Sequence, residues 1–568
     1  MFHSTPALWQ AILWLYIGAA AVLIIGHRLP NEVRRPVAAL CALLALRSWL
    51  VGGGQVEIFW EPLNLFRAGP VLQADDLSLL GGMTLTIVTI ALVLGIRGTG
   101  QTAWHGLFLA LLAGSLWATA AANLLALALG SALMDLALLA MALSAKDETG
   151  RAAWRMAVPG LVSTYLLFLS ALRMDTQMGH PSLLARNLSS DALLLLGLAG
   201  MWRLMVFPLH PRQLGSPQSA ATAILPAGVG IYLLVRAESL GPVLGSHPWT
   251  WLFAAGGLLA GGVMVWAGSV AARREESPGG VIKAILPGVI VQQGGYALAF
   301  VLWVGADSPW PLASLPLILG ILTIGWESTL EQESGEGEGW LAGITRRVRS
   351  ALGQWSLALS ARLRTPTVER ALRYGMALPF ILALLSAVGG PLTPGARVRW
   401  PLYAHLLHAG GAAPLLTLLI ADTLLVAGMP LAWDMLRQNR IRPGGGPLLA
   451  LPILTLPLIL LGVAPGLVGA PNLPPITLPP VSVWGLGLIV ILPWLIGIWF
   501  ARFGEQAEGI LTTLHAVANL DWLFRAAGWV GRQVVGILYW LGLVGEGDGW
   551  WGWALAVLAL GVAFLAVR

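Results

Sequence analysis

Apolar stretches of about 17–25 residues recur along the whole chain, and this recurrence constrains the fold more than any other feature of the sequence. A helix of that length crosses the roughly 30 Å hydrocarbon core of a bilayer with its backbone hydrogen bonds satisfied internally. Only 11% of the 568 residues are charged, against roughly 25% in typical soluble domains. The sequence therefore predicts an all-α, polytopic membrane protein.

The distribution of basic residues predicts how these stretches are oriented. When the loops are assigned alternately to two sides, most loop Lys and Arg fall on one side, which the positive-inside rule makes cytoplasmic. The chain is therefore expected to be a multi-pass protein of the cell inner (plasma) membrane with its N-terminus outside. The outer side receives only Arg67, Arg173, Arg186, Arg236, Arg397 and Arg399. About sixteen transmembrane spans are predicted, at residues 8–27, 35–52, 77–96, 103–120, 122–144, 157–174, 191–209, 220–236, 249–271, 282–304, 311–328, 373–390, 409–434, 447–469, 482–501 and 549–567.

Two long segments outside the spans are polar or amphipathic. Residues 329–372 begin acidic (ESTLEQESGEGEG) and continue basic, and residues 503–548 are typical of an interfacial helix on the membrane surface. Both are interpreted as solvated or interfacial faces, with a docking surface for a partner as the alternative. The first apolar run, residues 8–26, lacks a basic leader region and a small-residue cleavage site, so a retained helix is expected rather than a signal peptide.

The chain offers no sign of redox, nucleotide or metal chemistry of its own. Its single cysteine, Cys41, excludes an intrachain disulfide framework, a Cys-ligated iron–sulfur cluster and a multi-Cys zinc site. The sequence contains no dinucleotide-binding, P-loop or zinc-protease motif. We therefore expect no catalytic residue, no cofactor, no metal site and no nucleic-acid partner, and we expect the lipid bilayer as surroundings.

A few ionisable residues fall inside the predicted spans. A charge in hydrocarbon is costly, so each of them needs a partner, water or a function. Asp135 lies in the span 122–144, and Arg203 lies in the run DALLLLGLAGMWRLMVFPLHP. Three interpretations of these two residues stay open: a structural ion pair, part of an ion path, or single groups that each face water. The charged residues of interest in the spans are Arg47, Asp135, Arg203 and Asp422, and His405 and His408, just before the span 409–434, are further candidates.

Six motifs resemble, in the same order, those of the antiporter-like membrane subunits of respiratory complex I, a family that includes Mrp-type cation/proton antiporters and membrane-bound hydrogenases. The C-terminal LDWLFRAAGWVG (520–531) and a final span resemble the long members, which end in a lateral helix. The six motifs are LQADDLSLL (72–80), AANLLALAL (121–129), RLMVFPLHP (203–211), AGVGIYLLVR (227–236), KAILPGVIVQQGGYAL (283–298) and AVGGPLTPGARVR (387–399).

The resemblance implies a fold and a function. Its seventh and twelfth helices are expected to be broken, with Pro208 marking the first break, and broken helices expose backbone groups to internal water. Protons or sodium ions are thought to move along a chain of buried charges in this family, and its members work beside other membrane subunits of a multi-subunit complex. The resemblance divides the chain into N-terminal helices (1–120), a first antiporter-like repeat (121–270), a second repeat that includes loop 329–372 (271–435), and C-terminal helices with the interfacial segment (436–568).

The charge chain of the family is eroded in this sequence. The family glutamate falls at Ala132, with Asp135 one turn later, and the seventh-helix lysine position holds Arg203. The eighth-helix basic position falls near Gly228, and the twelfth-helix lysine falls at Arg399. An arginine stays protonated, so a relay cannot pass a proton through it. The candidates for a proton or ion path are Asp135, Arg203, His210, Lys283, Arg399, His405, His408 and Asp422.

Three functions agree with these observations. The first is a membrane-arm subunit of a complex I-like NADH (or other donor):quinone oxidoreductase, which either contributes to proton translocation or is a degenerate structural member. The second is a Mrp-type cation/proton antiporter or an ion-coupled inorganic-carbon uptake subunit. The third is an unrelated secondary transporter.

Overall fold

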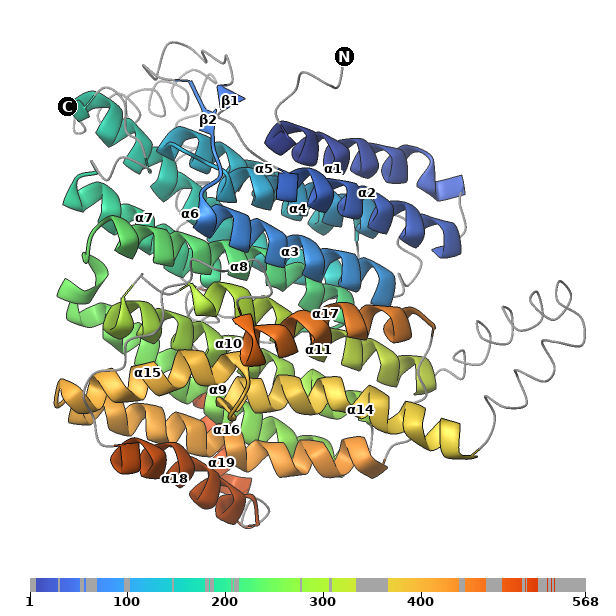
Figure 1. The fold of residues 1–568 in the computed structure, drawn as a ribbon, viewed down its shortest axis with the longest axis vertical. Helices are drawn as coiled ribbons and strands as arrows, with labels where there is room; N and C mark the ends of the chain where they lie inside the picture. Colours follow the sequence, from blue (N-terminus) through green and yellow to red (C-terminus); the bar gives the residue numbers. More distant parts are fainter. Residues whose placement is uncertain are drawn as a thin grey trace, which may run out of the picture. The chain divides into compact units, whose positions relative to one another are not determined.

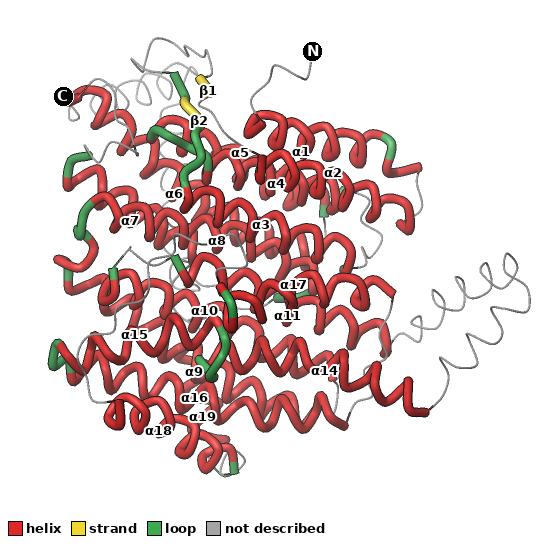
Figure 2. Tube along the Cα trace, in the orientation of Figure 1, coloured by secondary structure: helices red, strands yellow, loops and turns green. Residues whose placement is uncertain are grey.

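The part of the chain that the structure describes folds almost entirely into helices. In the computed structural model, Figure 2 shows nearly all of the described chain as helix. The described residues are 7–28, 31–51, 56–57, 69–96, 103–145, 148–178, 183, 188–205, 208, 214–275, 278–305, 309–333, 366–438, 445–465, 483–502, 506, 508–518, 529, 533 and 536. The helices are α1 (Ala7–Ile24), α2 (Asn31–Val51), α3 (Asp76–Gly95), α4 (Trp104–Thr119), α5 (Leu124–Ser144), α6 (Glu148–Met178), α7 (Ser190–Leu204), α8 (Pro217–Leu240), α9 (Pro248–Glu275), α10 (Pro278–Val304), α11 (Trp310–Glu333), α14 (Pro366–Val388), α15 (Pro394–His408), α16 (Ala412–Gln438), α17 (Gly445–Val463), α18 (Val483–Ala501) and α19 (Glu508–Ala518).

The all-α, polytopic class is confirmed. Within the described residues, nine helices are long and apolar enough to cross a membrane, and four shorter apolar helices accompany them. Fifteen of the sixteen predicted spans each fall on one of the helices, while the last, 549–567, lies outside the described residues. One small departure is a pair of two-residue antiparallel strands, β1 (Val56–Glu57) and β2 (Val71–Leu72).

The contact pattern divides the chain into two compact units, Met1–His515 and Ala516–Arg568. In the first unit the long helices lie side by side, with α1 and α2 at one edge and α16 and α18 at the opposite edge (Figure 1). The apolar windows of α8 and α11 are completely buried, whereas those of α1 and α16 are only 39% buried. The central helices are thus covered by other helices and not by lipid.

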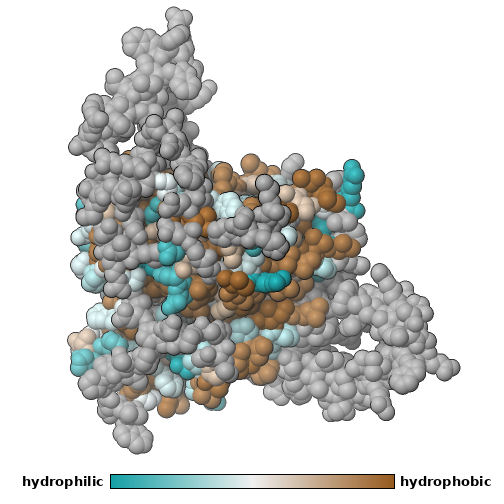
Figure 3. All heavy atoms as spheres, turned by 45° about the horizontal axis from the view of Figure 1, so that its top comes forward, coloured by the Kyte–Doolittle hydropathy of each residue, from teal (hydrophilic) through white to brown (hydrophobic). Residues whose placement is uncertain are grey.

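The outward faces of the peripheral helices are apolar. Leu143 and Leu252 are 82% and 69% exposed, and Leu495 on α18 is 65% exposed. Figure 3 shows one face of the molecule, and hydrophobic side chains cover much of its described surface, with hydrophilic groups in scattered patches. Apolar surface this extensive is expected where a helix faces lipid or another membrane subunit.

Polar caps set where several helices begin. The side chains of Asp75, Asn123, Ser189 and Ser216 each accept a hydrogen bond from a backbone N–H in the first turn of α3, α5, α7 and α8. Such residues satisfy N–H groups that have no partner inside the helix.

Near the two places where the resemblance predicts broken helices, α7 ends and α14 gives way to α15. Helix α7 ends at Leu204, and Met205 takes a left-handed conformation (φ 53°) while its N–H bonds to the carbonyls of Met201 and Trp202. The helix therefore ends before Pro208 and short of residue 209, the predicted end of the span, and the break of this helix stays a prediction. Between α14 and α15 the chain leaves the helix for residues 389–393, with Gly389 at φ 78° and Leu392 at φ 62°.

The predicted non-spanning segments are only partly described. Helix α11 continues to Glu333 and α14 begins at Pro366, so helices extend into both ends of the predicted segment 329–372, and residues 334–365 lie outside the described residues. Of the predicted interfacial segment 503–548 the structure describes mainly α19, whose side chains are mostly exposed. The four-part division of the chain stays a prediction.

Candidate functional site

The first site is a buried ion pair between α5 and α7. Arg203 Nη2 lies 3.0 Å from Asp135 Oδ2, and the two side chains are 0% and 1% exposed. Sequence analysis left a structural pair, an ion path and two separate groups open; the structure brings the two residues together, so they are not separate groups. Both charges are fully removed from water, and each depends on the other for compensation.

Hydrogen bonds with residues of α6 hold both partners of this pair. Arg203 Nη2 donates to Thr164 Oγ1 (2.9 Å) and to the Gly160 carbonyl (3.2 Å), and Nε donates to Ser163 Oγ (3.3 Å). Thr164 Oγ1 in turn donates to Asp135 Oδ2 at 2.5 Å. Arg203 also lies in the last turn of α7, where the helix dipole favours a cation. The guanidinium is therefore fixed by several partners at once.

Gly160 makes room for the carboxylate of Asp135. A Cβ atom at Gly160 would overlap Asp135 Oδ1. We expect Gly160→Ala to destabilise the protein by about 1–3 kcal/mol, because the added methyl must displace the pair or the α6 backbone. The measurement is the apparent melting temperature in detergent. Gly487 on α18 is the matched control: a Cβ there meets nothing within 4 Å, so Gly487→Ala should be neutral or stabilising by up to about 1 kcal/mol. Equal losses in the two variants would contradict this account.

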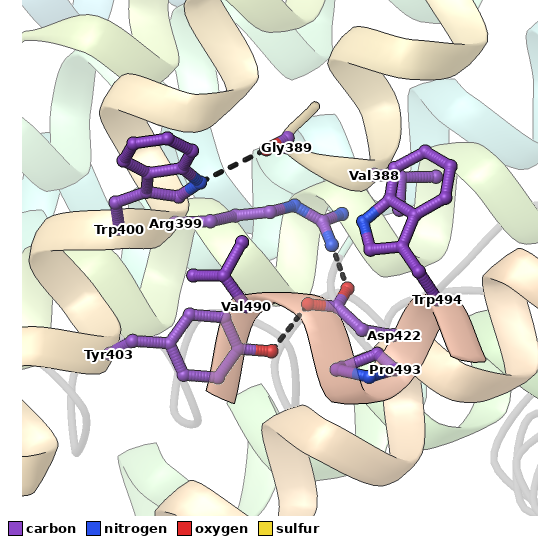
Figure 4. A pocket seen from close by; sticks show the side chains of 9 residues that line it. All are labelled: Val388, Gly389, Arg399, Trp400, Tyr403, Asp422, Val490, Pro493 and Trp494. Atoms are coloured by element: carbon purple, nitrogen blue, oxygen red, sulfur yellow. Dashed lines mark hydrogen bonds and ion pairs between the residues drawn. The ribbon is translucent and has the colours of Figure 1, made fainter. Parts of the chain in front are cut away.

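The second site is a buried pair between α15 and α16. Arg399 forms an ion pair with Asp422, and both side chains are almost completely buried. Tyr296 of α10 and Tyr403 of α15 donate hydrogen bonds to the two oxygens of Asp422, at 2.6 Å and 2.5 Å. Figure 4 shows Arg399 and Tyr403 reaching from α15 toward Asp422, with Trp494 of α18 beside them. The carboxylate thus has three donors from two helices.

The break between α14 and α15 positions the guanidinium of Arg399. It donates to the carbonyl of Ala387 in the last turn of α14, where unpaired carbonyl groups favour a cation. Its Cζ lies 3.8 Å from the centroid of the Tyr296 ring. A Cβ atom at Gly389 would overlap the Arg399 side chain, and the positive φ of Gly389 also favours glycine. The break is therefore part of the site.

A third ion pair joins α3 to α8, and sequence analysis did not predict it. Arg236 makes two hydrogen bonds to Asp75, Nη1 to Oδ2 at 2.6 Å and Nη2 to Oδ1 at 2.7 Å. Arg236 Nη2 also donates to the hydroxyl oxygens of Tyr232 (2.9 Å) and Ser78 (3.3 Å). Both charged residues occur in the quoted motifs 72–80 and 227–236, but their separation of 161 residues gave no sign that they meet.

The pKa of Asp75 predicts how this third pair responds to pH. Burial raises the pKa of Asp75, but the hydrogen bonds and charge of Arg236 outweigh burial and hold it below its usual value. The ion pair therefore adds stability at pH values above the unfolded pKa of about 3.9, and this stability is lost as the pH falls through the lower folded pKa.

We expect Asp75→Asn to lower the stability by about 1–3 kcal/mol at neutral pH, because it removes the charge from the bidentate pair. Asparagine is itself a good N-cap, so the start of α3 is kept. Melting curves of both proteins in detergent should converge as the pH falls below about 4. A difference that stays constant over that pH range would contradict the ionic origin of the effect.

The other predicted path residues that the structure describes do not join these sites. Lys283 is exposed near the start of α10, and His408 is half-exposed at the end of α15. His405 is half-buried, and its Nδ1 lies 2.9 Å from the Pro401 carbonyl of the same helix. His210 lies outside the described residues. The path residues that come together are therefore Asp135 with Arg203 and Arg399 with Asp422.

The sequence predicted a loop between the spans 373–390 and 409–434, with Arg397 and Arg399 in it, and the structure corrects this because both lie on α15. Arg236, at the end of the predicted span 220–236, lies on α8. Helix α15 was not predicted as a separate helix because its residues PGARVRWPLY look like a loop. Pro394 in fact stands in the first turn, where proline is favoured. The buried tyrosines of the second site were missed because hydroxyl partners depend on the tertiary fold.

The chemistry available at these sites is limited. Arginine is not deprotonated in proteins, so both cations of the buried sites are permanent. Among the described residues, no group of three or more His, Cys, Asp or Glu side chains could hold a metal ion. The sites can hold charge, fix helices and bind water, and only their aspartates and tyrosines can exchange protons.

Comparison with solved structures identifies the fold. The chain is similar to one in the structure of the Mrp complex from Dietzia sp. DQ12-45-1b, with a TM-score of 0.63 and 19% identity over 99% of this chain and 62% of that chain. It is also similar to a chain of the membrane-bound sulfane sulfur reductase (MBS), an archaeal respiratory membrane complex, with a TM-score of 0.62 and 15% identity over 99% of this chain and 100% of that chain. No protein-family model and no curated protein matches the sequence. The chain spans less than two thirds of the length of the Mrp chain, and at these identities the likeness shows a shared fold.

Proposed function

We propose that the chain is an antiporter-like membrane subunit of a multi-subunit complex of the complex I-like or Mrp kind, in which it is a structural member that does not itself carry protons. The shared fold with chains of the Mrp complex and MBS supports its place in such an assembly. The observation that carries the structural role is that Arg203 and Arg399 supply the buried cations and are both locked by Asp partners.

The positions of the two pairs support an origin in the two-repeat antiporter fold. Asp135 and Arg203 fall in the predicted repeat 121–270, and Arg399 and Asp422 fall in the predicted repeat 271–435. Arg203 lies in the last turn of α7, and Arg399 lies on α15, the helix that follows the non-helical residues 389–393. The other parts of the proposal follow the resemblance: about sixteen spans, the N-terminus outside, and α19 as the start of a lateral interfacial helix.

Ion movement by the assembled complex tests this proposal. We expect the variant Asp135→Asn/Arg203→Gln, and likewise Asp422→Asn/Arg399→Gln, to leave proton or sodium uptake into inverted membrane vesicles within about twofold of wild type per assembled complex. Removal of a group that relays protons should instead lower the rate by about 100-fold or more. Such a loss in a complex that still assembles would establish a transporting subunit, as in the Mrp-type alternative.

An exposed ion pair provides the matched control for these vesicle measurements. Arg173 and Asp191 lie 2.8 Å apart with side chains 53% and 62% exposed. The variant Arg173→Gln/Asp191→Asn also removes one positive and one negative charge, but from water-exposed positions. Uptake by this variant defines the effect of removing a charge pair that lies outside the buried sites.

A further inference from the structure

Two small cavities lie against α15. The first lies between α15, α16 and α18, and polar groups of Tyr403 and Asp422 line it together with the Trp494 ring (Figure 4). The second lies between α10, α11 and α15, and Gln293, Tyr296 and Ser314 supply its polar lining. Each has room for about one water molecule and enough polar groups to bind it.

Arg399 separates these cavities. Among the residues that the structure describes around them, Arg399 is the one that lines both. Its guanidinium is held in place by the carboxylate of Asp422 and by the face of the Tyr296 ring. Both cavities are therefore bordered by the same side chain.

We infer that the Arg399 side chain is a plug that closes a lateral polar passage running from α10 and α11, past α15, to α18. Without the side chain the two polar cavities become one continuous space that water can enter, and a chain of waters also conducts protons. A permanent cation suits this role because it cannot lose its charge and withdraw from Asp422. The inference concerns this chain alone and holds whatever complex contains it.

A plug predicts that the volume of the side chain at position 399 closes the passage, whereas the charge of Arg399 holds that side chain against Asp422. Replacing Arg399 alone would leave the buried carboxylate of Asp422 without its partner. The test therefore uses an Asp422→Asn background, in which the side chain at position 399 can be changed without leaving a lone buried charge. In that background we compare Arg399→Ala, Arg399→Leu and Arg399→Met. Methionine is long and unbranched and fills irregular gaps, whereas alanine leaves the space open.

Hydrogen–deuterium exchange of the purified full-length protein is the readout, with water itself as the probe. We expect amides around Ser314 on α11 and around residue 422 on α16 to exchange about tenfold faster in the Arg399→Ala variant than in the Arg399→Met variant, because exchange requires water to reach the opened amide. The Arg399→Leu variant should give intermediate exchange rates. If one of the three variants does not fold, the other two still provide the comparison. The α5 segment around Asp135, in the other site, should exchange equally in all of them.

Arg397 provides the matched control on the same helix. It also lies against an aromatic ring, with Cζ 4.9 Å from the centroid of Trp310, and it donates to the Gly462 carbonyl at 3.2 Å, but it lines neither cavity. Arg397→Ala and Arg397→Met should therefore not differ around Ser314 and Asp422. The plug is overturned if the alanine and methionine variants at position 399 exchange alike, or if the alanine variant exchanges faster along the whole chain including α5.

Discussion

Replacing Asp422 by alanine is expected to destabilise the protein by about 3–5 kcal/mol, because the change leaves the buried cation of Arg399 without its partner. The hydroxyl groups of Tyr296 and Tyr403 lose their acceptor in the same step. The measurement is the loss of folded protein with denaturant or heat in detergent, compared with wild type at the same lipid and salt content.

An exposed ion pair and a double substitution separate this effect from a general loss of charge. Arg173→Met breaks the exposed pair with Asp191 and should cost less than about 1 kcal/mol. The double variant Asp422→Leu/Arg399→Met removes both buried charges, so it should recover most of the stability lost by Asp422→Ala. If the double variant is no more stable than Asp422→Ala, the uncompensated charge is not the cause.

The helices could be predicted from the sequence because the bilayer sets their length. Each apolar run had to span the fixed thickness of the bilayer core, so the length and position of these runs located fifteen helices that the structure describes. Their ends were less predictable, because the ends depend on local geometry. Helix α7 shows this: Met205, an ordinary apolar residue, ends it in a left-handed conformation, while the more conspicuous Pro208 lies beyond the end.

The buried charges were predictable as isolated residues and only partly as pairs. Asp135 and Arg203 stand out because each interrupts an apolar run, and few partners exist for either. Arg399 stands in a segment rich in Pro, Gly and Arg that resembles a loop, so its burial against Asp422 requires knowledge of how α15 packs. The same is true of Asp75 and Arg236, which meet because α3 and α8 lie side by side.

The two buried pairs share a physical arrangement despite their different helices. Each arginine binds a backbone carbonyl of a neighbouring helix as well as its aspartate, Gly160 for Arg203 and Ala387 for Arg399. An arginine can do this because its planar group carries five donors in a fixed fork. Lysine has one ammonium group and could satisfy only some of these partners, so the use of arginine favours fixed geometry over exchange of protons.

Arg203→Lys is therefore expected to be a severe change although it keeps the charge. The guanidinium donates to Asp135, Thr164 and Gly160 through Nη2 and to Ser163 through Nε. A lysine ammonium replaces only part of this set, and each lost hydrogen bond to a charged group costs about 1.5–3 kcal/mol. We expect a total loss of about 2–4 kcal/mol, measured as the shift of the unfolding midpoint in detergent.

Lys283→Arg is the matched control, because it makes the opposite exchange at an exposed position on α10 and should change stability by less than about 0.5 kcal/mol. If Arg203→Lys is also nearly neutral, the fork of donors is not what holds α5, α6 and α7 together. The charge alone would then suffice at this site, and a lysine there could release its proton where the native arginine cannot.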